Sequence, residues 1–314
     1  MMGDFKDKQK IDVQQMINNK KSKQNKLQII EKIVPVFLFL CAALSILTTV
    51  GILFTLLRES ITFFGQNGFM NFITGTTWNP WTGKFGVLPL IAGTLLITVI
   101  SIGVALPIGL ASAIFLSEYA SDKVRRTIKP TLEVLAGIPT VVYGYFAVTF
   151  VTPILQVIFP EMDIFNALSA GLVVGIMIVP MIASLAEDAM NSVPNGLREG
   201  ALALGCTRFE VAWKVVVPAA FSGIVAATVL AISRAIGETM IVTIAAGATP
   251  NLTFNPLVSI ETLTAFIVQG IKGDTTFGSN IYYSVYAVGM TLFVFTLGMN
   301  LLSQYIARKF REEY

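Results

Sequence analysis

The sequence has no histidine, only two cysteines and few charged residues. Charged side chains make up 13% of its 314 residues, about half the share found in typical globular domains. The lack of histidine excludes imidazole-based metal sites and a histidine general base. Cys41 lies in an apolar run and Cys206 in a polar segment, so we expect no disulfide between them, and no cysteine cluster indicates a metal site.

Nucleotide-binding and catalytic patterns are also missing. The sequence contains no G-x-x-x-x-G-K-[S/T] loop, so we do not expect the chain to bind ATP in that manner. It shows no pairing of a nucleophile with a base, which disfavours a membrane enzyme. We therefore expect no catalytic residue, no metal and no cofactor in this chain.

Apolar residues are abundant and make up 54% of the chain. Several apolar runs exceed the roughly 18 residues that indicate a membrane-spanning helix. Six such runs cover residues 33–57, 88–116, 131–159, 164–190, 218–248 and 282–306. They predict an all-α membrane protein with six transmembrane helices.

Lysine and arginine are distributed unevenly around these runs. Residues 1–32, the loops after the second and fourth runs, and the C-terminus are basic, whereas the remaining loops hold only Arg58, Lys84 and Lys272. Basic loops favour the cytoplasm, so we expect both termini there, in a multi-pass protein of the cell membrane surrounded by lipid. Topology thus explains the lysines of residues 1–32, an expected disordered tail, without a nucleic-acid partner. The predicted domain organisation is then the tail at 1–32, a first transmembrane helix at 33–57, an extracytoplasmic loop at 58–87 and a helical core at 88–314.

Three local patterns make smaller predictions. Gly171 and Gly175 have the spacing of small residues at which two membrane helices approach closely. Trp78 and Trp81 belong either at the level of the lipid headgroups or in a docking surface for an outside partner. Residues 257–271 are apolar but too short to span, so we expect a short helix at the outer membrane face.

Two opposite charges lie inside the fifth apolar run. Arg234 and Glu238 are four residues apart, which places them on one face of a continuous helix, with the hydroxyls of Ser233 and Thr239 nearby. An ionised side chain at mid-membrane costs at least ~2.5–3.5 kcal/mol, so it needs a partner charge or a polar pathway. Either the two residues neutralise each other and join helices, or Arg234 lines a pathway for an anion and Glu238 restrains it. Arginine before glutamate is the weaker order for a pair within a helix, which favours partners elsewhere.

Other carboxylates lie near the cytoplasmic ends of the predicted spans. We expect Glu133 at a helix start, where the helix dipole favours a negative charge. Glu187 and Asp188 lie at a helix end, where the dipole disfavours them. They therefore need a cation, with Arg198 or Arg208 as the candidates.

The polar segment between the fourth and fifth runs carries unusually complete helix signals. Residues 197–204 predict a short helix that Gly205 ends. Thr207 and Glu210 predict a capping box at the start of a second helix. The apolar surface of this second helix consists of Phe209, Val211, Ala212 and Trp213. The segment is therefore predicted to form a small folded projection at the membrane surface.

This segment resembles the coupling loop in the permease subunits of binding-protein-dependent ABC importers. Glu199, Ala201, Gly205 and Pro218 fit the pattern E-x-A-x-x-x-G-x9-[apolar]-x-[apolar]-P, with one departure at Gly200, where alanine is usual. In that family the loop forms a coupling helix that fits a groove on a cytoplasmic ATPase. The resemblance implies the type I importer permease fold and a coupling helix near residues 196–213. It also implies a set of ATPase-coupling residues, namely Glu199, Ala201, Gly205, Phe209, Trp213 and Pro218.

Residues 77–80, 133–144 and 231–239 narrow the resemblance, because they are similar to segments of the PstC-type permeases of phosphate importers. That resemblance implies that Arg234 and Glu238, with Ser233 and Thr239, line a phosphate pathway. It also implies three kinds of partner: a second, PstA-type permease, two cytoplasmic ATPase subunits that bind the ATP, and an extracytoplasmic phosphate-binding protein.

Three alternatives stay open at this point. An arginine does not by itself choose among oxyanions, so the cargo could be sulfate or molybdate. An ion- or proton-coupled secondary transporter would use Arg234 and Glu238 as a relay but would leave the polar projection unexplained. In a membrane scaffold, the two charges would only join helices.

Overall fold

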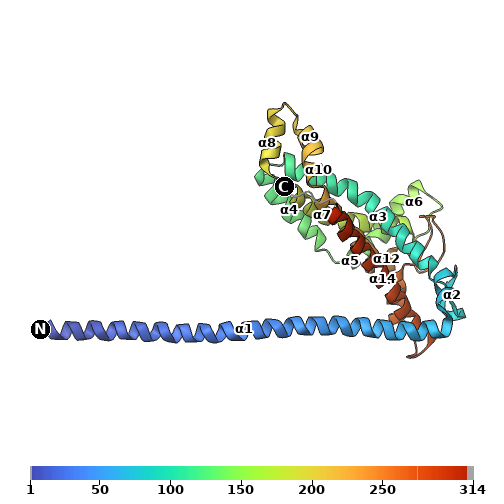
Figure 1. Ribbon diagram of the computed structural model, residues 1–314. Helices are drawn as coiled ribbons and strands as arrows, with labels where there is room; N and C mark the ends of the chain where they lie inside the picture. The colour runs from blue at the N-terminus through green and yellow to red at the C-terminus, as the bar shows by residue number, and fades with distance from the viewer. Residues whose placement is uncertain (1, 274, 310–314) are drawn as a thin grey trace. The chain divides into compact units, whose positions relative to one another are not determined.

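The computed structural model describes residues 2–273 and 275–309, which form helices for most of their length (Figure 1). The chain divides into two units, residues 1–56 and residues 57–314. The α-helices are α1 (Met2–Asn67), α2 (Phe69–Thr74), α3 (Leu88–Ile114), α4 (Asp122–Ala136), α5 (Thr140–Phe146), α6 (Thr152–Ile158), α7 (Ala167–Asn191), α8 (Asn195–Ala203), α9 (Arg208–Val211), α10 (Val217–Ala219), α11 (Phe221–Ile236), α12 (Met240–Ala245), α13 (Leu263–Lys272) and α14 (Asn280–Lys309). Shorter elements are the 3-10 helix η1 (Pro80–Thr82), the π-helices η2 (Phe115–Tyr119), η3 (Ala147–Val151) and η4 (Ala212–Val216), and the antiparallel strands β1 (Trp78–Asn79) and β2 (Lys84–Phe85).

The first unit consists of the greater part of α1, whose segment Ile33–Asn67 is long and apolar enough to cross a membrane. Two expectations are corrected here. Residues 2–32 are helical instead of disordered, and their lysines and glutamines are good helix formers. Residues 58–67, expected in a loop, continue α1, because nothing interrupts the helix before Gly68, which has a φ of 78°.

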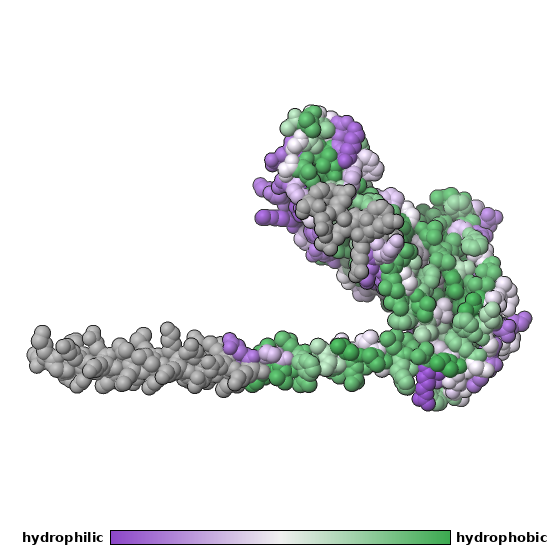
Figure 2. All heavy atoms as spheres, viewed as in Figure 1, coloured by the Kyte–Doolittle hydropathy of each residue, from purple (hydrophilic) through white to green (hydrophobic). Residues whose placement is uncertain are grey.

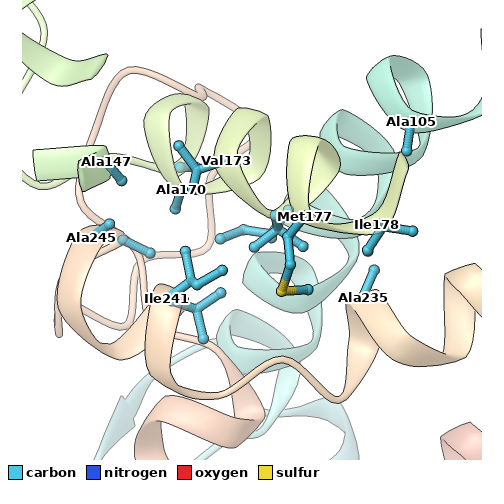
Figure 3. Close-up of a cluster of buried hydrophobic side chains, with 14 of the residues drawn as sticks. Ala105, Ala147, Ala170, Val173, Met177, Ile178, Ala235, Ile241 and Ala245 are labelled. Atoms are coloured by element: carbon cyan, nitrogen blue, oxygen red, sulfur yellow. The ribbon is translucent and has the colours of Figure 1, made fainter. Parts of the chain in front are cut away.

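Helix α7 lies at the centre of the second unit, between α3, α11 and α12. The side chains between these helices form one apolar cluster, to which η3 also contributes (Figure 3). Many of its members are small, and those labelled in Figure 3 are Ala105, Ala147, Ala170, Val173, Met177, Ile178, Ala235, Ile241 and Ala245. Small side chains allow close helix contacts, which drive association in a membrane where hydrophobic burial contributes little.

Two glycines of α7 allow α3 to approach it closely. A Cβ added to Gly175 would lie 2.8 Å from the carbonyl oxygen of Ser101, and one added to Gly171 would lie 2.7 Å from the side chain of Ile100. The Ser101 hydroxyl also donates a hydrogen bond to the carbonyl of Gly171, at 2.9 Å. The prediction that Gly171 and Gly175 mark a close helix contact is confirmed.

The strands, α2 and α13 surround a second, aromatic cluster. Trp78 is 3% exposed and packs edge-to-face on Phe266 at 4.8 Å between ring centroids. Trp78 is therefore part of a protein core and is not exposed to lipid or to an outside partner, whereas Trp81 is 76% exposed. The short helix expected within residues 257–271 is confirmed as α13.

The expected third span is wrong at its beginning. Residues 122–136 form the separate helix α4, and the spanning segment, Thr140–Ile158, begins after Gly137 and Pro139. Pro139 favours an extended backbone for the residue before it, which separates the two helices. Glu133 consequently lies in the last turn of α4 and not at a helix start.

The expected fifth span is broken twice. A bend of 73° separates Arg208–Ala219 from Phe221–Ile236, and Gly237–Thr239 interrupt the helix again before α12. In the described part of the chain, five helices are long and apolar enough to span a membrane, or six if the bent pair counts as one span. The all-α membrane architecture is confirmed, with five unbroken candidate spans and the bent pair as the sixth.

Figure 1 shows α8 and α9 projecting beyond the other helices at one end of the second unit. On the face of this unit drawn in Figure 2, hydrophobic residues dominate the middle, and hydrophilic residues gather toward the projection and toward the opposite end. This distribution is typical of a protein whose middle lies in a bilayer.

Candidate functional site

The break between α11 and α12 is held by polar groups. Glu238 follows the end of α11, and its Oε1 accepts a 3.3 Å hydrogen bond from the backbone N–H of Ile241 at the start of α12. Thr264 donates a 2.7 Å hydrogen bond from its hydroxyl to the Glu238 carbonyl. The break is therefore a defined structure in which a carboxylate caps the second half-helix.

Arg234 and Glu238 contact each other across this break. Arg234 Nη1 lies 3.2 Å from Glu238 Oε2, although Oε2 has no partner with hydrogen-bond geometry. The expectation of partners elsewhere is wrong, because α11 ends at Ile236 and the chain turns so that Glu238 reaches back to Arg234. The expectation of one continuous helix face is wrong for the same reason.

The two charged groups differ in exposure. The Glu238 side chain is 2% exposed, whereas that of Arg234 is 42% exposed. A guanidinium carries five N–H donors, and a single loose contact with Glu238 leaves most of them free for another acceptor. The pair thus presents a cation at the surface and keeps the compensating anion buried.

Of the two neighbouring hydroxyls, one bonds to a side chain of another helix and the other to the local backbone. Ser233 donates a 2.9 Å hydrogen bond to Asn300 Oδ1 of α14. This orients the Asn300 amide so that its N–H groups remain available as donors. Thr239 bonds to the backbone, at Gly237 O. Sequence reasoning missed Asn300, although an asparagine inside an apolar run was a usable signal.

The projection has the caps predicted for it. Helix α8 ends before Gly205, whose φ of 88° provides the left-handed turn. Thr207 and Glu210 form the capping box of α9. The backbone N–H of Thr207 first, then Lys214 and the Thr207 hydroxyl, hold the pKa of Glu210 at about 2, so the box is charged at neutral pH.

The six predicted coupling residues have different environments. Phe209 and Trp213 are 65% and 54% exposed, and Glu199, Gly205 and Pro218 are also exposed. Ala201 is buried in a small apolar cluster that holds the projection against the end of α7. Five of these positions are therefore available to a partner, whereas Ala201 supports the fold of the segment.

The partners of Glu187 and Asp188 differ from those expected. Glu187 is fully buried and pairs with Arg125 at 2.5 Å and Lys129 at 2.8 Å, both on α4, and Lys129 also contacts Asp188. Burial lowers the pKa of Lys129, but its hydrogen bonds to Asp188 and Glu187 prevail and raise the pKa above the ordinary value. These bonds form because α4 packs beside α7.

Arg198, one of the expected partners, contacts a different carboxylate. Its Nε lies 3.1 Å from Oε1 of Glu118, which belongs to η2. Neither residue is more than 15% exposed at the side chain. This pair joins α8 to the end of the helix formed by α3 and η2.

A cavity of about 220 Å³ lies beside the aromatic cluster, on the side of the unit that carries β1 and α13. Its lining includes Trp78, Trp81, Glu261 and Phe266. Glu261 lies in the loop between α12 and α13, and burial raises its pKa to about 8. Sequence reasoning missed this carboxyl group, because nothing local distinguishes it from an exposed glutamate.

Comparison with known proteins found a matching protein family and several similar permeases. Residues 105–312 match the family described as "Binding-protein-dependent transport system inner membrane component". The chain is 37% identical over 274 residues to a probable ABC transporter permease protein, YqgH, of Bacillus subtilis, covering 86% of this chain and 88% of that protein. It is 34% identical over 255 residues to the phosphate transport system permease protein PstC of Mesorhizobium japonicum, covering 75% of this chain and 77% of that protein.

Two solved structures share the fold. One is a bacterial ABC transporter involved in the import of alginate, with a TM-score of 0.61, 18% identity, and coverage of 87% of this chain and 96% of that one. The other is the MetNI methionine ABC transporter in an inward-facing conformation, with a TM-score of 0.54, 20% identity, and coverage of 75% and 100%. At these identities the likeness concerns the fold alone.

Proposed function

The chain belongs to the family of binding-protein-dependent transport system inner membrane components, and from this premise we propose that it is the permease subunit of an ATP-driven phosphate importer. It is a multi-pass membrane protein of a transport family and not an enzyme. The phosphate cargo is supported by relatives that carry the name phosphate transport system permease protein PstC.

The observation that carries the proposal is the partly exposed Arg234 beside the break between α11 and α12. A phosphate ion offers acceptor oxygens that match a guanidinium in charge and geometry. Glu238 lowers the cost of keeping Arg234 in an apolar region, and its loose contact leaves the guanidinium able to exchange partners. Ser233, which precedes Arg234 in the sequence, orients the amide of Asn300, and we propose that this amide adds donors to the same pathway.

The energy source is a partner chain, because the sequence has no G-x-x-x-x-G-K-[S/T] loop. We propose that two cytoplasmic ATPase subunits grip the projection through Phe209 and Trp213, and that α8 and α9 act as the coupling helix. A second permease of PstA type completes the pathway, and an extracytoplasmic binding protein delivers phosphate.

The proposed orientation follows from the basic residues. Helix α4 and the projection carry Lys123, Arg126 and Arg208 on one side of the spans, whereas Lys84 and Lys272 lie on the other. Both termini and the projection then face the cytoplasm.

The test is uptake of radiolabelled phosphate by proteoliposomes that contain the assembled complex, the binding protein and internal ATP. Arg234→Ala is expected to lower uptake roughly 10- to 100-fold, since a hydrogen bond to a charged group is worth about 1.5–3 kcal/mol. Arg126→Ala, which removes an exposed arginine from α4, is the matched control and should leave uptake unchanged.

Three results would contradict the proposal. Uptake at the wild-type rate by a fully assembled Arg234→Ala complex would exclude a role for this cation. Uptake by the chain alone, without an ATPase, would favour a secondary transporter. Equal uptake of sulfate or molybdate would replace phosphate by a broader oxyanion cargo.

A further inference from the structure

The guanidinium of Arg198 fastens α8 to two other elements. Besides its 3.1 Å contact with Glu118, it donates hydrogen bonds to the carbonyls of Val193, at 2.6 Å, and Met190, at 2.7 Å. The Met190 carbonyl lies in the last turn of α7 and the Val193 carbonyl two residues beyond the helix, where the helix dipole gives a partial negative charge. One side chain thus binds the end of α7 and the end of η2 at the same time.

Polar contacts continue from Glu118 into α7. The hydroxyl of Ser117 lies 2.9 Å from Glu118 Oε1 and 3.3 Å from Asn191 Oδ1. The amide of Asn191 in turn donates a 2.6 Å hydrogen bond to Glu187 Oε1. Glu118 and Ser117 lie in a π-helical turn, a distortion that is frequent at functional sites.

From Glu187 the contacts reach α4. Glu187 is fully buried and pairs with Arg125 and Lys129. No residue of α4 is fully buried, so this helix has little apolar packing to fix its place. Its ion pairs with α7 are therefore a principal means of positioning it.

Helix α4 leads directly into the helix beside the candidate pathway. After Gly137–Pro139 the chain continues as α5, in which a Cβ on Gly144 would lie 3.0 Å from the side chain of Ile244. Ile244 belongs to α12, the half-helix that Glu238 caps. The polar contacts therefore run from the projection to α4, and α5, which follows α4 in the chain, packs against α12 at the break.

We propose that Arg198, Glu118 and Glu187 are positioning residues, which make α8 move together with the cytoplasmic ends of α3, α7 and α4. A displacement of α8 by its ATPase partner would then reach α5 and α12 without loss. This inference rests on the proposed function for its partner, but the link between α8 and α4 is a property of this chain alone.

The first experiment measures coupling in the assembled complex. Phosphate imported per ATP hydrolysed is compared between the wild type, Arg198→Lys and Glu118→Gln, with Lys123→Gln, an exposed α4 position, as the control. Lysine keeps the charge, but its compact ammonium lacks the planar fork of donors with which the guanidinium reaches Glu118 and the two carbonyls. We expect both variants to retain ATP hydrolysis stimulated by the binding protein and to import severalfold less phosphate per ATP. An unchanged ratio, including one in which both activities fall equally, would overturn the inference.

The second experiment does not depend on cargo or partners. Hydrogen exchange of the full chain in detergent is compared between the wild type, Arg198→Gln and Lys123→Gln. We expect Arg198→Gln to accelerate exchange in the peptide that covers α4, although Arg198 itself makes its contacts with η2 and α7. Wild-type exchange in α4 would overturn the link even if phosphate import were established, and a complex that imports no phosphate would contradict only the proposed function.

Discussion

At the scale of single residues, the chain keeps charges in an apolar setting by pairing a buried anion with a more exposed cation. Glu238 at 2% and Arg234 at 42% exposure follow this arrangement at the helix break. Glu187, which is fully buried on α7, shows the same arrangement with the more exposed Arg125 and Lys129 of α4. Burying an ionised carboxylate without a partner would cost several kcal/mol, so each cation stabilises the fold as well as its site.

Glu261 differs, because the charge it would carry has no ion-pair partner among the described residues. Burial raises its pKa to about 8, so the folded protein retains a proton that the unfolded chain releases above about 4.5. The contribution of Glu261 to stability therefore decreases as pH rises from 4.5 to 8 and is constant above 8.

We predict that Glu261→Gln removes part of the pH dependence of stability. The melting temperature of the purified protein in detergent, followed between pH 5 and pH 8, should fall less steeply in Glu261→Gln than in the wild type. Glu161→Gln alters an exposed carboxylate and should leave the slope as it is. Identical slopes in wild type and Glu261→Gln would show that this carboxyl is ionised in the folded protein.

At the scale of elements, the projection is a case in which local rules determine the structure. The capping box at Thr207 and the left-handed Gly205 were both predicted, because each depends on hydrogen bonds and backbone geometry within a few residues. The breaks around α4 and α11 were missed. Hydropathy averages over a window and does not register where Gly137, Pro139 or Gly237 stops a helix.

Two glycine substitutions test the backbone of the projection. Gly205→Ala should destabilise the segment by about 1–2 kcal/mol, since an alanine at φ 88° is strained even though no atom lies within 4 Å of the added Cβ. Gly200→Ala, which is equally unobstructed but lies inside α8, should stabilise it by up to about 1 kcal/mol. Hydrogen exchange of residues 195–216 measures both. A loss of protection in Gly200→Ala, or none in Gly205→Ala, would contradict this account.

At the scale of the whole molecule, the projection combines exposed aromatic side chains with charged ones, which sets it apart from the lipid-facing helices. Phe209 and Trp213 lie on a segment with Arg208, Glu210 and Lys214, which is typical of a protein-binding surface. Large aromatic side chains of this kind contribute most of the affinity of many interfaces. The projection is the part of the chain best suited to hold a soluble partner.

Phe209→Ala and Trp213→Ala are each expected to weaken association with the proposed ATPase partner by about 10-fold or more, as loss of a buried aromatic anchor does. Co-purification of the ATPase and binding assays in detergent provide the measurement. Phe277→Ala removes an 82% exposed phenylalanine from the loop between α13 and α14 and serves as the control. Equal binding by all three variants would assign the ATPase contact to another surface.

Composition and local pattern were enough to predict the membrane class, the placement of three of the six spans within a few residues, the close contact at Gly171 and Gly175, and the caps of the projection. These depend on composition and on interactions over a few residues. Which charges pair could not be predicted in this way. Glu118 and Arg198 are 80 residues apart and Ser233 and Asn300 are 67 apart, so their contacts exist because helix packing brings distant segments together.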